Sequence, residues 1–374
     1  MFAFVTHRLR RLVLAALAAF VLLNTPGSAQ VLIQRDQPDL SITPQERKAV
    51  IDGLLKRLNE NYIFPDKARA MEQAIRARQE KKEYDGITSA KQFADTLSRH
   101  LQEVCHDKHL HLVYSHDPQP RKMTIDPAMR RRMHAQMERM NFGFEKVERL
   151  QGNIGYLELR GFMDAEAAGP MAAAAMSLLA HTDALIIDLR QNGGGTPSMV
   201  ALLCSYFFDG PPQHLNDLHF RRASGEEIQQ WWTLPYVPGQ RYVDKAVYIL
   251  TSKRTFSAAE EFTYDLQAQK RATVVGEATG GGAHPVRGQI LTDHFGVMIP
   301  MGQAINPVTK SNWEGTGVKP DIQVPASKAL KTAYLTALKK LLDKKDIDPM
   351  QKHELEEAIQ RVTSGAKQLP SGKR

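Results

Sequence analysis

The chain has 374 residues, with 49 Lys or Arg, 41 Asp or Glu and a formal net charge of +8. The positive excess comes from the N-terminal segment and a basic stretch at 367–374, and elsewhere both signs of charge are interspersed, so nucleic-acid binding is not indicated. Two cysteines, Cys105 and Cys204, exclude a disulfide framework, and their apolar surroundings favour buried free thiols.

Residues 1–29 have the pattern of a secretory signal peptide. Basic residues precede an apolar run at 12–23, and the small residues Gly27 and Ala29 suit a cleavage site, so the mature chain is expected to begin near Gln30. The run is too short to cross a bilayer comfortably, and no cysteine follows it where a lipid would be attached. We therefore expect a periplasmic or secreted protein without a stable membrane anchor. An uncleaved anchor is the alternative.

Helical signals dominate the first part of the mature chain. The segment Thr43–Glu46 has the N-cap, the first-turn proline and the acidic third residue of a capping box, and apolar residues recur at helical spacing after it. Ser89 is a second candidate N-cap. These patterns predict a helical N-terminal domain over residues 30–108.

Strand and helix signals alternate in the remainder of the chain. Apolar runs at 184–189, 246–251 and 272–276 are typical of strands buried in a largely parallel sheet. Further strands are expected at 110–114, at 153–159 and, as short antiparallel pieces, within 286–305, and helices at 127–140, 328–342 and 349–361. The sequence predicts an α/β core over 109–327, followed by helices and a basic tail over 328–374.

Three glycines follow the strand predicted at 184–189. In Asp188-Leu-Arg-Gln-Asn-Gly-Gly-Gly-Thr-Pro-Ser198 the strand ends, the glycines turn the chain, and a helix begins near Pro197. Such a turn can present backbone N–H groups to an anion. A tight strand-to-helix turn explains the glycines equally, and neither nucleotide-binding glycine pattern is matched.

Ser257 follows the strand predicted at 246–251. A helix begins at about this residue, which places its hydroxyl at the edge of the sheet, near the positive end of a helix. A serine there can serve as a nucleophile. An N-cap role explains the same residue type.

Several motifs, in this order, resemble the tail-specific, or C-terminal processing, serine peptidases. The resemblance rests on Asp188–Gly195, Thr255–Glu260 and Gly276–Gly282. The segments Thr279–Pro285 and Asn312–Asp321 are similar to the branch of that family that includes the interphotoreceptor retinoid-binding protein repeats. The likeness extends from about residue 40 to 330.

The resemblance implies a fold. It implies an α/β core of the spiral ββα type found in crotonase-like and Clp-protease-like proteins, preceded by an N-terminal helical bundle. Processing peptidases usually carry a PDZ module between these two parts. The stretch 115–151 is too short for one, so no PDZ insertion is expected.

The resemblance also implies the reacting residues. The lysine that the best-known processing peptidases use is replaced by Gly282, so a Ser-Lys dyad is not available. Tricorn-like members instead pair the serine with an upstream histidine and a downstream glutamate. His109 lies where the helical domain meets the core, and Glu314 follows Ser257 by 57 residues. We predict Ser257, His109 and Glu314 as the catalytic set, with Glu314 orienting the imidazole directly or through another polar group.

Serine chemistry also needs N–H donors for the oxyanion of the tetrahedral intermediate. By position, the Gly193 or Gly194 amide and the Ala258 amide are the candidates. His284, which follows a glycine-rich loop, is a rival for the base. We predict instead that it positions substrate or makes a structural hydrogen bond.

A metal site is a further alternative. His106, His109 and His111 with Asp107 form a local cluster of ligand types. No helix-borne metalloprotease motif is present, and a metal hydrolase would leave Ser257 unexplained, so no metal is predicted.

We expect a serine-type peptidase that hydrolyses peptide bonds of envelope or secreted proteins or peptides through an acyl-enzyme on Ser257. No cofactor is expected, and no oligomeric state is predicted. The alternative is a non-catalytic carrier of apolar ligands, because the retinoid-binding branch keeps this fold as a carrier. The presence of Ser257, His109 and Glu314 together favours the peptidase, since a carrier has no chemical need for all three.

Overall fold

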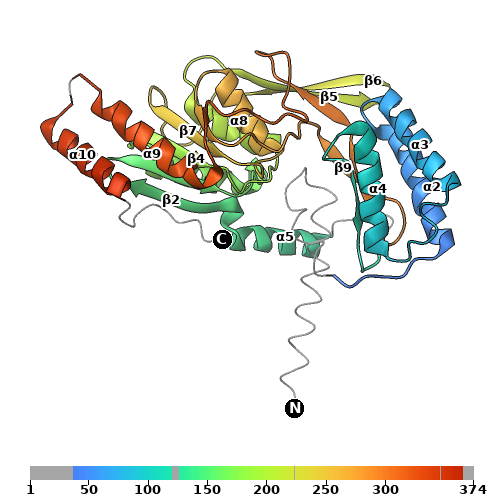
Figure 1. Cartoon of the computed structure of the whole chain (residues 1–374). Coiled ribbons are helices and arrows are strands. Elements are labelled where there is room, and N and C mark those ends of the chain that lie inside the picture. Colours follow the sequence, from blue (N-terminus) through green and yellow to red (C-terminus); the bar gives the residue numbers. More distant parts are fainter. Residues whose placement is uncertain (1–36, 120–125, 223, 346, 365–374) are drawn as a thin grey trace. The chain divides into compact units, whose positions relative to one another are not determined.

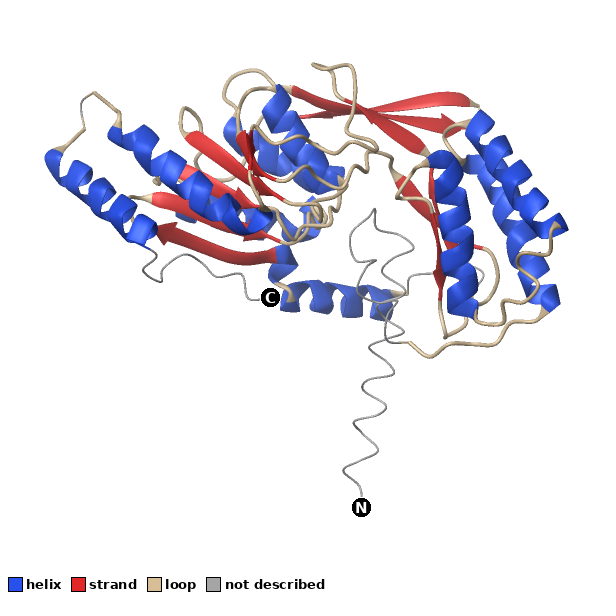
Figure 2. Cartoon of the chain, in the orientation of Figure 1, coloured by secondary structure: helices blue, strands red, loops and turns tan. Residues whose placement is uncertain are grey.

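The computed structural model describes residues 37–119, 126–222, 224–345 and 347–364, and these divide into two compact units. The first unit holds the described residues up to Gln136, together with Asp217–Gln230 and Gly282–Ile305. The second unit holds Met137–Asn216, Trp231–Gly281 and the described residues after Ile305. Figures 1 and 2 show the helices and strands of both units.

The predicted signal peptide at 1–29 and the basic stretch at 367–374 lie outside the described residues. Among the residues that are described, no helix is both long enough and apolar enough to cross a membrane. Cys105 and Cys204 are buried free thiols, as predicted.

Three helices of the first unit lie side by side (Figure 1). They are α2 (Pro44–Asn61), α3 (Pro65–Glu80) and α4 (Ala90–Cys105). The predicted capping box opens α2, where the Thr43 N–H donates to Glu46 Oε2 (2.7 Å) and the Glu46 N–H donates to Thr43 Oγ1 (3.2 Å). Ser89 Oγ accepts a hydrogen bond of 3.0 Å from the Gln92 N–H at the start of α4. Both predicted N-caps are confirmed.

An antiparallel sheet of order β1-β10-β9 packs against these helices. Its strands are β1 (His111–Tyr114), β9 (Val286–Ile290) and β10 (Phe295–Pro300). Alternate residues of β10, Phe295, Val297 and Ile299, enter one core with the apolar helix faces. A second sheet of order β11-β5-β6 contains β5 (His214–Arg222), β6 (Gly225–Trp232) and β11 (Gly302–Ile305). The short antiparallel strands predicted within 286–305 are confirmed.

A six-stranded sheet forms the centre of the second unit. Its order is β12-β8-β7-β4-β3-β2, and only β2 and β3 pair antiparallel. The strands are β2 (Phe144–Leu150), β3 (Ile154–Leu159), β4 (Ala184–Asp188), β7 (Ala246–Thr251), β8 (Thr273–Gly276) and β12 (Ile322–Gln323). The three apolar runs of the sequence are therefore the parallel strands β4, β7 and β8, as predicted.

Helices cover both faces of this sheet (Figures 1 and 2). One face packs on α6 (Ala165–Leu179), α7 (Pro197–Cys204) and α8 (Ala258–Ala268), and the other on α9 (Ala326–Leu342) and α10 (Pro349–Ser364). Within β4, Leu185 and Ile187 enter the first core, and Ala184 and Ile186 enter the second. A strand buried on both faces must be apolar at successive positions, which explains the uninterrupted runs in the sequence.

The chain between β1 and β2 is short. Its described part holds α5 (Pro127–Arg139) and a 3-10 turn at Asn141–Gly143, and no PDZ module. The predicted α/β class is confirmed. The compact units cut across the predicted limits 30–108, 109–327 and 328–374, because Asp217–Gln230 and Gly282–Ile305 pack with the N-terminal helices. Those domain limits remain a prediction.

Three buried carboxyl groups lie on helix α8, and two of them, Glu261 and Asp265, have raised pKa values. Glu261 and Asp265 lie one helical turn apart, and Asp265 Oδ1 accepts a hydrogen bond of 3.0 Å from Asn306 Nδ2. Burial raises the pKa of Glu261 to about 7, and burial together with the charge of Glu261 raises the pKa of Asp265. The folded protein therefore holds protons at this pair that the unfolded chain releases.

The buried pair of Glu261 and Asp265 should make the protein less stable as the pH rises. The decrease should begin near pH 4.5, the ordinary pKa of Glu261, and continue through about pH 7, the pKa of Glu261 in the folded protein. A carboxyl group with a raised folded pKa contributes stability below its unfolded pKa and loses that contribution above its folded pKa. Glu261→Gln cannot ionise, so the difference in the free energy of unfolding between about pH 5 and about pH 8 should shrink. Urea denaturation measures it, with the exposed Glu356→Gln as control. An unchanged difference would contradict the raised pKa.

Candidate active site

Ser257 lies in a turn with an unusual backbone conformation. It follows β7 and is the N-cap of α8, with φ 55° and ψ −126°. Such a conformation costs a non-glycine residue about 1–3 kcal/mol and persists only where the surroundings enforce it. Here Thr255 Oγ1 donates to the Leu189 carbonyl (2.8 Å), and the Phe256 N–H donates to the Asn192 carbonyl (3.1 Å). The turn after β7 is thereby fastened to the turn after β4.

Gly194 touches the serine directly. Because β4 and β7 are parallel neighbours, with Asp188 opposite Leu250, the turns that follow them lie side by side. A Cβ atom on Gly194 would lie 2.7 Å from Ser257 Cβ and 2.9 Å from the Ala258 nitrogen. Its φ of 110° also favours glycine. The glycine run therefore does more than turn the chain, because it allows one backbone to approach the serine closely.

The three amides predicted for the oxyanion differ in their bonding. The Gly194 N–H donates to Asn192 Oδ1 at 2.9 Å. The Ala258 N–H is the first of α8, a position for which a helix supplies no acceptor of its own. Gly193 is partly exposed, and no hydrogen bond within the described residues uses its N–H. Of the two glycine amides, Gly193 is therefore the one free to bind an anion.

Glu314 lies in a loop of the second unit that is anchored at both ends. Its own N–H donates to Asn312 Oδ1 (2.9 Å), and the next residue, Gly315, donates to the Gly281 carbonyl (3.0 Å). The ring of the preceding Trp313 packs against Tyr264 of α8, with ring centroids 5.3 Å apart. Glu314 is thus held by neighbours that contact the helix beginning at Ser257 and the loop after β8.

In the first unit, one buried carboxylate contacts two histidines. Asp107 Oδ2 lies 2.6 Å from His284 Nδ1, and Asp107 Oδ1 accepts a hydrogen bond of 3.0 Å from the His109 N–H. The Tyr62 hydroxyl donates to the same carboxylate at 3.3 Å. Burial acts to raise the pKa of Asp107, but the hydrogen bond and charge of His284 outweigh it and lower the pKa. Asp107 is therefore held as an anion beside both imidazoles.

His109 lies in the turn between α4 and β1 and is almost entirely buried. Burial lowers its pKa to about 4, against the opposing effect of the Asp107 charge, and His284 lowers it further. Its imidazole is consequently neutral over the physiological range. His284 is also buried and packs edge-on against Phe64, with ring centroids 5.5 Å apart.

The predicted site residues divide between the units. Five of them belong to the second unit, namely Ser257, Glu314, Gly193, Gly194 and Ala258, whereas His109 and His284 belong to the first.

Sequence reasoning did not assign a role to Asp107 beyond the metal alternative, and it passed over Glu260. The Asp107–His284 pair joins residues 177 positions apart, so no local pattern indicates it. Glu260 stands three residues after Ser257, which is the spacing of a capping box and a signal that the sequence does contain.

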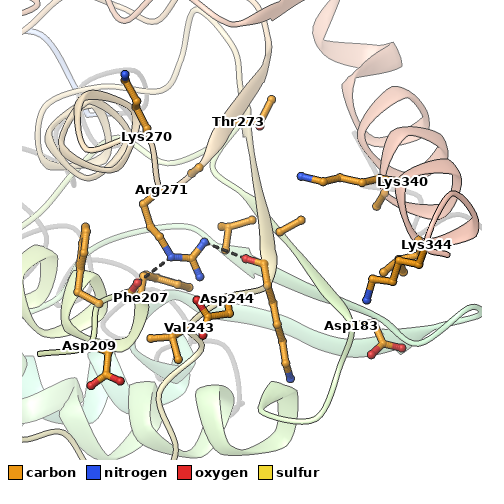
Figure 3. Close-up of a pocket in the computed structure, with 17 residues that line it drawn as sticks. Asp183, Phe207, Asp209, Val243, Asp244, Lys270, Arg271, Thr273, Lys340 and Lys344 are labelled. Atoms are coloured by element: carbon orange, nitrogen blue, oxygen red, sulfur yellow. Dashed lines mark hydrogen bonds between the residues drawn. The ribbon is translucent and has the colours of Figure 1, made fainter. Parts of the chain in front are cut away.

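A separate pocket of about 810 Å³ lies in the second unit (Figure 3). Its lining includes Ala246 and Val247 at the start of β7, whereas Ser257 follows the end of that strand. At about 3.3 Å per residue, the six residues of β7 separate the two places by roughly 20 Å. Arg271 in this pocket is bound to the carbonyls of Phe207 (2.7 Å) and Lys245 (2.9 Å). We assign the pocket no part in the chemistry of Ser257.

The chain matches two family models. Residues 153–324 match the model described as peptidase family S41, and residues 42–142 match the N-terminal domain of that peptidase in eukaryotic interphotoreceptor retinoid-binding protein (IRBP). The fold is that of an α/β protein in which Ser257 lies in the turn that follows a parallel strand. The chain belongs to peptidase family S41, which confirms the predicted family and its retinoid-binding-protein-like branch.

Solved structures share the fold. A candidate peptidase from Parabacteroides merdae is 18% identical, with a TM-score of 0.53, and the match covers 87% of this chain and 99% of that one. A lipoprotein from Streptococcus agalactiae is 16% identical, with a TM-score of 0.51, and the match covers 80% and 98% respectively. At these identities the likeness concerns the fold alone.

Gly194→Ala should lower the reactivity of Ser257 by about tenfold or more, because the added methyl group would displace the serine from its turn. The measurement is the rate of labelling of the folded protein by a fluorophosphonate. The control is Gly210→Ala, whose φ is also positive (82°) but whose new Cβ would meet nothing within 4 Å. Equal labelling rates in the two variants would contradict the importance of this close approach.

Proposed function

We propose that this family S41 protein is a serine-type peptidase that cleaves peptide bonds through an acyl-enzyme on Ser257. The observation that carries the proposal is the Ser257 turn itself. Its strained conformation and the close approach of Gly194 support a role for Ser257 as nucleophile, and the Gly193 and Ala258 N–H groups are proposed as the oxyanion donors. An ordinary N-cap needs neither the strain nor the glycine contact.

The chemistry assigns a role to each predicted residue. Neutral His109 accepts the proton of the Ser257 hydroxyl as Oγ forms a bond to the scissile carbonyl carbon. The oxyanion that results is stabilised by the Gly193 and Ala258 N–H groups, and such a donor is typically worth about a hundredfold to a thousandfold in rate. His109 then gives its proton to the leaving amine as the C–N bond breaks, and water hydrolyses the ester by the same route.

Glu314 is proposed to orient His109 and to offset the charge of the imidazolium, directly or through another polar group. A Ser-Lys mechanism is not proposed, because Gly282 stands at the position of the lysine. His109 belongs to the first unit and Ser257 to the second, and the proton transfer requires hydrogen-bond reach between them in the reacting enzyme.

His284 is a second imidazole whose environment suits proton transfer, because Asp107 lies 2.6 Å from its Nδ1. A carboxylate so placed fixes the tautomer and the orientation of the ring. We propose that His109 is the base and that His284 positions substrate or makes a structural hydrogen bond, and the variants described next distinguish the two histidines.

The substrates are proposed to be proteins or peptides of the cell envelope or secreted space, with no cofactor and no nucleic-acid partner. The family supports a peptide substrate. The periplasmic or secreted location rests on the signal-peptide pattern of residues 1–29. The alternative function, carriage of apolar ligands, is an outcome of the following experiment.

Labelling with a fluorophosphonate should modify Ser257 of the purified mature protein, and intact mass with peptide mapping locates the adduct. Ser257→Ala should abolish the adduct, because the attacking oxygen is gone. His109→Ala should slow labelling by about a hundredfold or more, because no base takes the proton. His284→Ala should slow it less.

The control is Ser252→Ala in the same turn, where the hydroxyl bonds the Arg190 carbonyl at 2.6 Å. This variant should keep the adduct on Ser257. Folded wild-type protein that remains unlabelled would overturn the peptidase proposal and favour the carrier. Loss of reactivity in His284→Ala but not in His109→Ala would transfer the role of base to His284.

The rate of labelling should remain high well below pH 6.5, the ordinary pKa of histidine, because burial keeps His109 neutral down to about pH 4. A base acts in its neutral form, so activity falls only as the pH drops through this lowered pKa. The measurement is the labelling rate against pH, with circular dichroism as a check that the protein stays folded. An apparent pKa at or above 6.5 would show that His109 in this environment is not the base.

A further inference from the structure

Glu260 is a buried carboxylate at the centre of the second unit's hydrogen bonds around Ser257. Its Oε2 accepts a hydrogen bond of 2.9 Å from the Ser257 N–H. Its Oε1 accepts one of 2.5 Å from the Thr279 hydroxyl and one of 2.6 Å from the Gly281 N–H. The side chain has no exposed surface. One carboxylate thus joins the nucleophile's backbone to the loop that follows β8.

The same bonds continue to the loop that carries Glu314. Thr279 Oγ1 accepts from the Val318 N–H at 2.6 Å while it donates to Glu260. The Gly281 carbonyl accepts from the Gly315 N–H at 3.0 Å. Both loops are packed backbone to backbone, because a Cβ on Gly281 would lie 3.0 Å from Gly315 and one on Gly317 would lie 2.3 Å from the Thr279 carbonyl oxygen. Glu260 is therefore linked to Ser257 on one side and to the residue after Glu314 on the other.

We propose that Glu260 is a positioning residue for the serine reaction, which holds Ser257 in its strained turn and sets its place relative to the Glu314 loop. The inference rests on Ser257 being the nucleophile. A buried charge is stabilised when donors surround it, and here three donors converge on the two oxygens. The bond to the Ser257 N–H is the one that fixes the orientation of the turn.

The turn needs this bond. A serine at φ 55° and ψ −126° is in a sparsely populated conformation, and the first N–H groups of a helix otherwise turn toward water. The Ala258 amide follows Ser257 directly, so rotation of the turn would displace the nucleophile and an oxyanion donor together. A displacement of about 1 Å is enough to cost roughly a hundredfold in rate.

Glu260→Gln tests the role with little change in shape. The glutamine amide has one oxygen and one nitrogen, so its NH₂ group must face either the Ser257 N–H or the Gly281 N–H, and one side of the bridge is lost. We expect the limiting rate of fluorophosphonate acylation, kinact, to fall about tenfold to a hundredfold while the binding constant of the probe stays unchanged. Rates are taken per folded protein, with thermal melting as the check on folding.

Glu261→Gln is the matched control, because this adjacent residue of the same helix is also a buried carboxyl group, and no hydrogen bond within the described residues joins its side chain to Ser257. It should change the melting temperature but not kinact. If the role of Glu260 were purely structural, Glu260→Gln would likewise change the melting temperature and leave kinact unchanged.

If Glu260→Gln does not fold, Thr279→Val and Thr279→Ser replace it. The valine removes the hydroxyl that donates to Glu260 and should lower kinact, and the serine keeps it and should restore the rate. Folded Glu260→Gln, or folded Thr279→Val, that acylates at the wild-type rate would overturn the inference while the peptidase proposal stands. Failure of wild-type Ser257 to react at all would instead overturn the peptidase proposal, and the role of Glu260 with it.

Discussion

The parallel pairing of β4 with β7 fixes where the proposed chemistry of the second unit can occur. Parallel strands end at the same edge of a sheet, so the turns that leave Asp188 and Leu250 emerge side by side. One turn supplies the glycine amides and the other supplies Ser257. Because both strands are buried between helical layers, the pair is rigid, and its two turns are positioned by the core and not by the loops themselves.

The site also stores conformational strain, and the surrounding contacts offset it. Ser257 occupies a conformation that an isolated serine avoids, and Gly194 lies so close that no other residue type fits. The turn is held by the hydrogen bonds that Thr255 Oγ1 and the Phe256 N–H donate, and by the one that the Glu260 carboxylate accepts from the Ser257 N–H. A conformation enforced at this expense is typical of residues with a function.

The first unit contributes ionisable groups of a different kind. Asp107 stays charged because two histidines surround it, and His109 stays neutral because it is buried. Environments that push neighbouring pKa values apart are characteristic of acid–base sites. A carrier of apolar ligands would gain nothing from burying this charged group, so the first unit independently favours an enzyme.

The sequence by itself predicted the N-terminal helices, the buried parallel strands and the turns after β4 and β7, because local spacing and turn residues carry that information. It did not predict β2, β5, β6 or α6. The local pattern at Ser257 fitted an N-cap equally well, and the candidacy of this residue as nucleophile came from the resemblance of several motifs to a known family. It also identified Gly193, Gly194 and Ala258 as possible donors, but only the tertiary structure distinguished them, since the Gly194 amide is already bound to Asn192. The Asp107–His284 pair could not be predicted from the sequence, because 177 residues separate the two and no pattern links them. The bridge from Glu260 to the Thr279 and Gly281 loop was likewise decided by packing. Contacts between distant segments depend on how strands and loops meet in space, and a single sequence records only the neighbours along the chain.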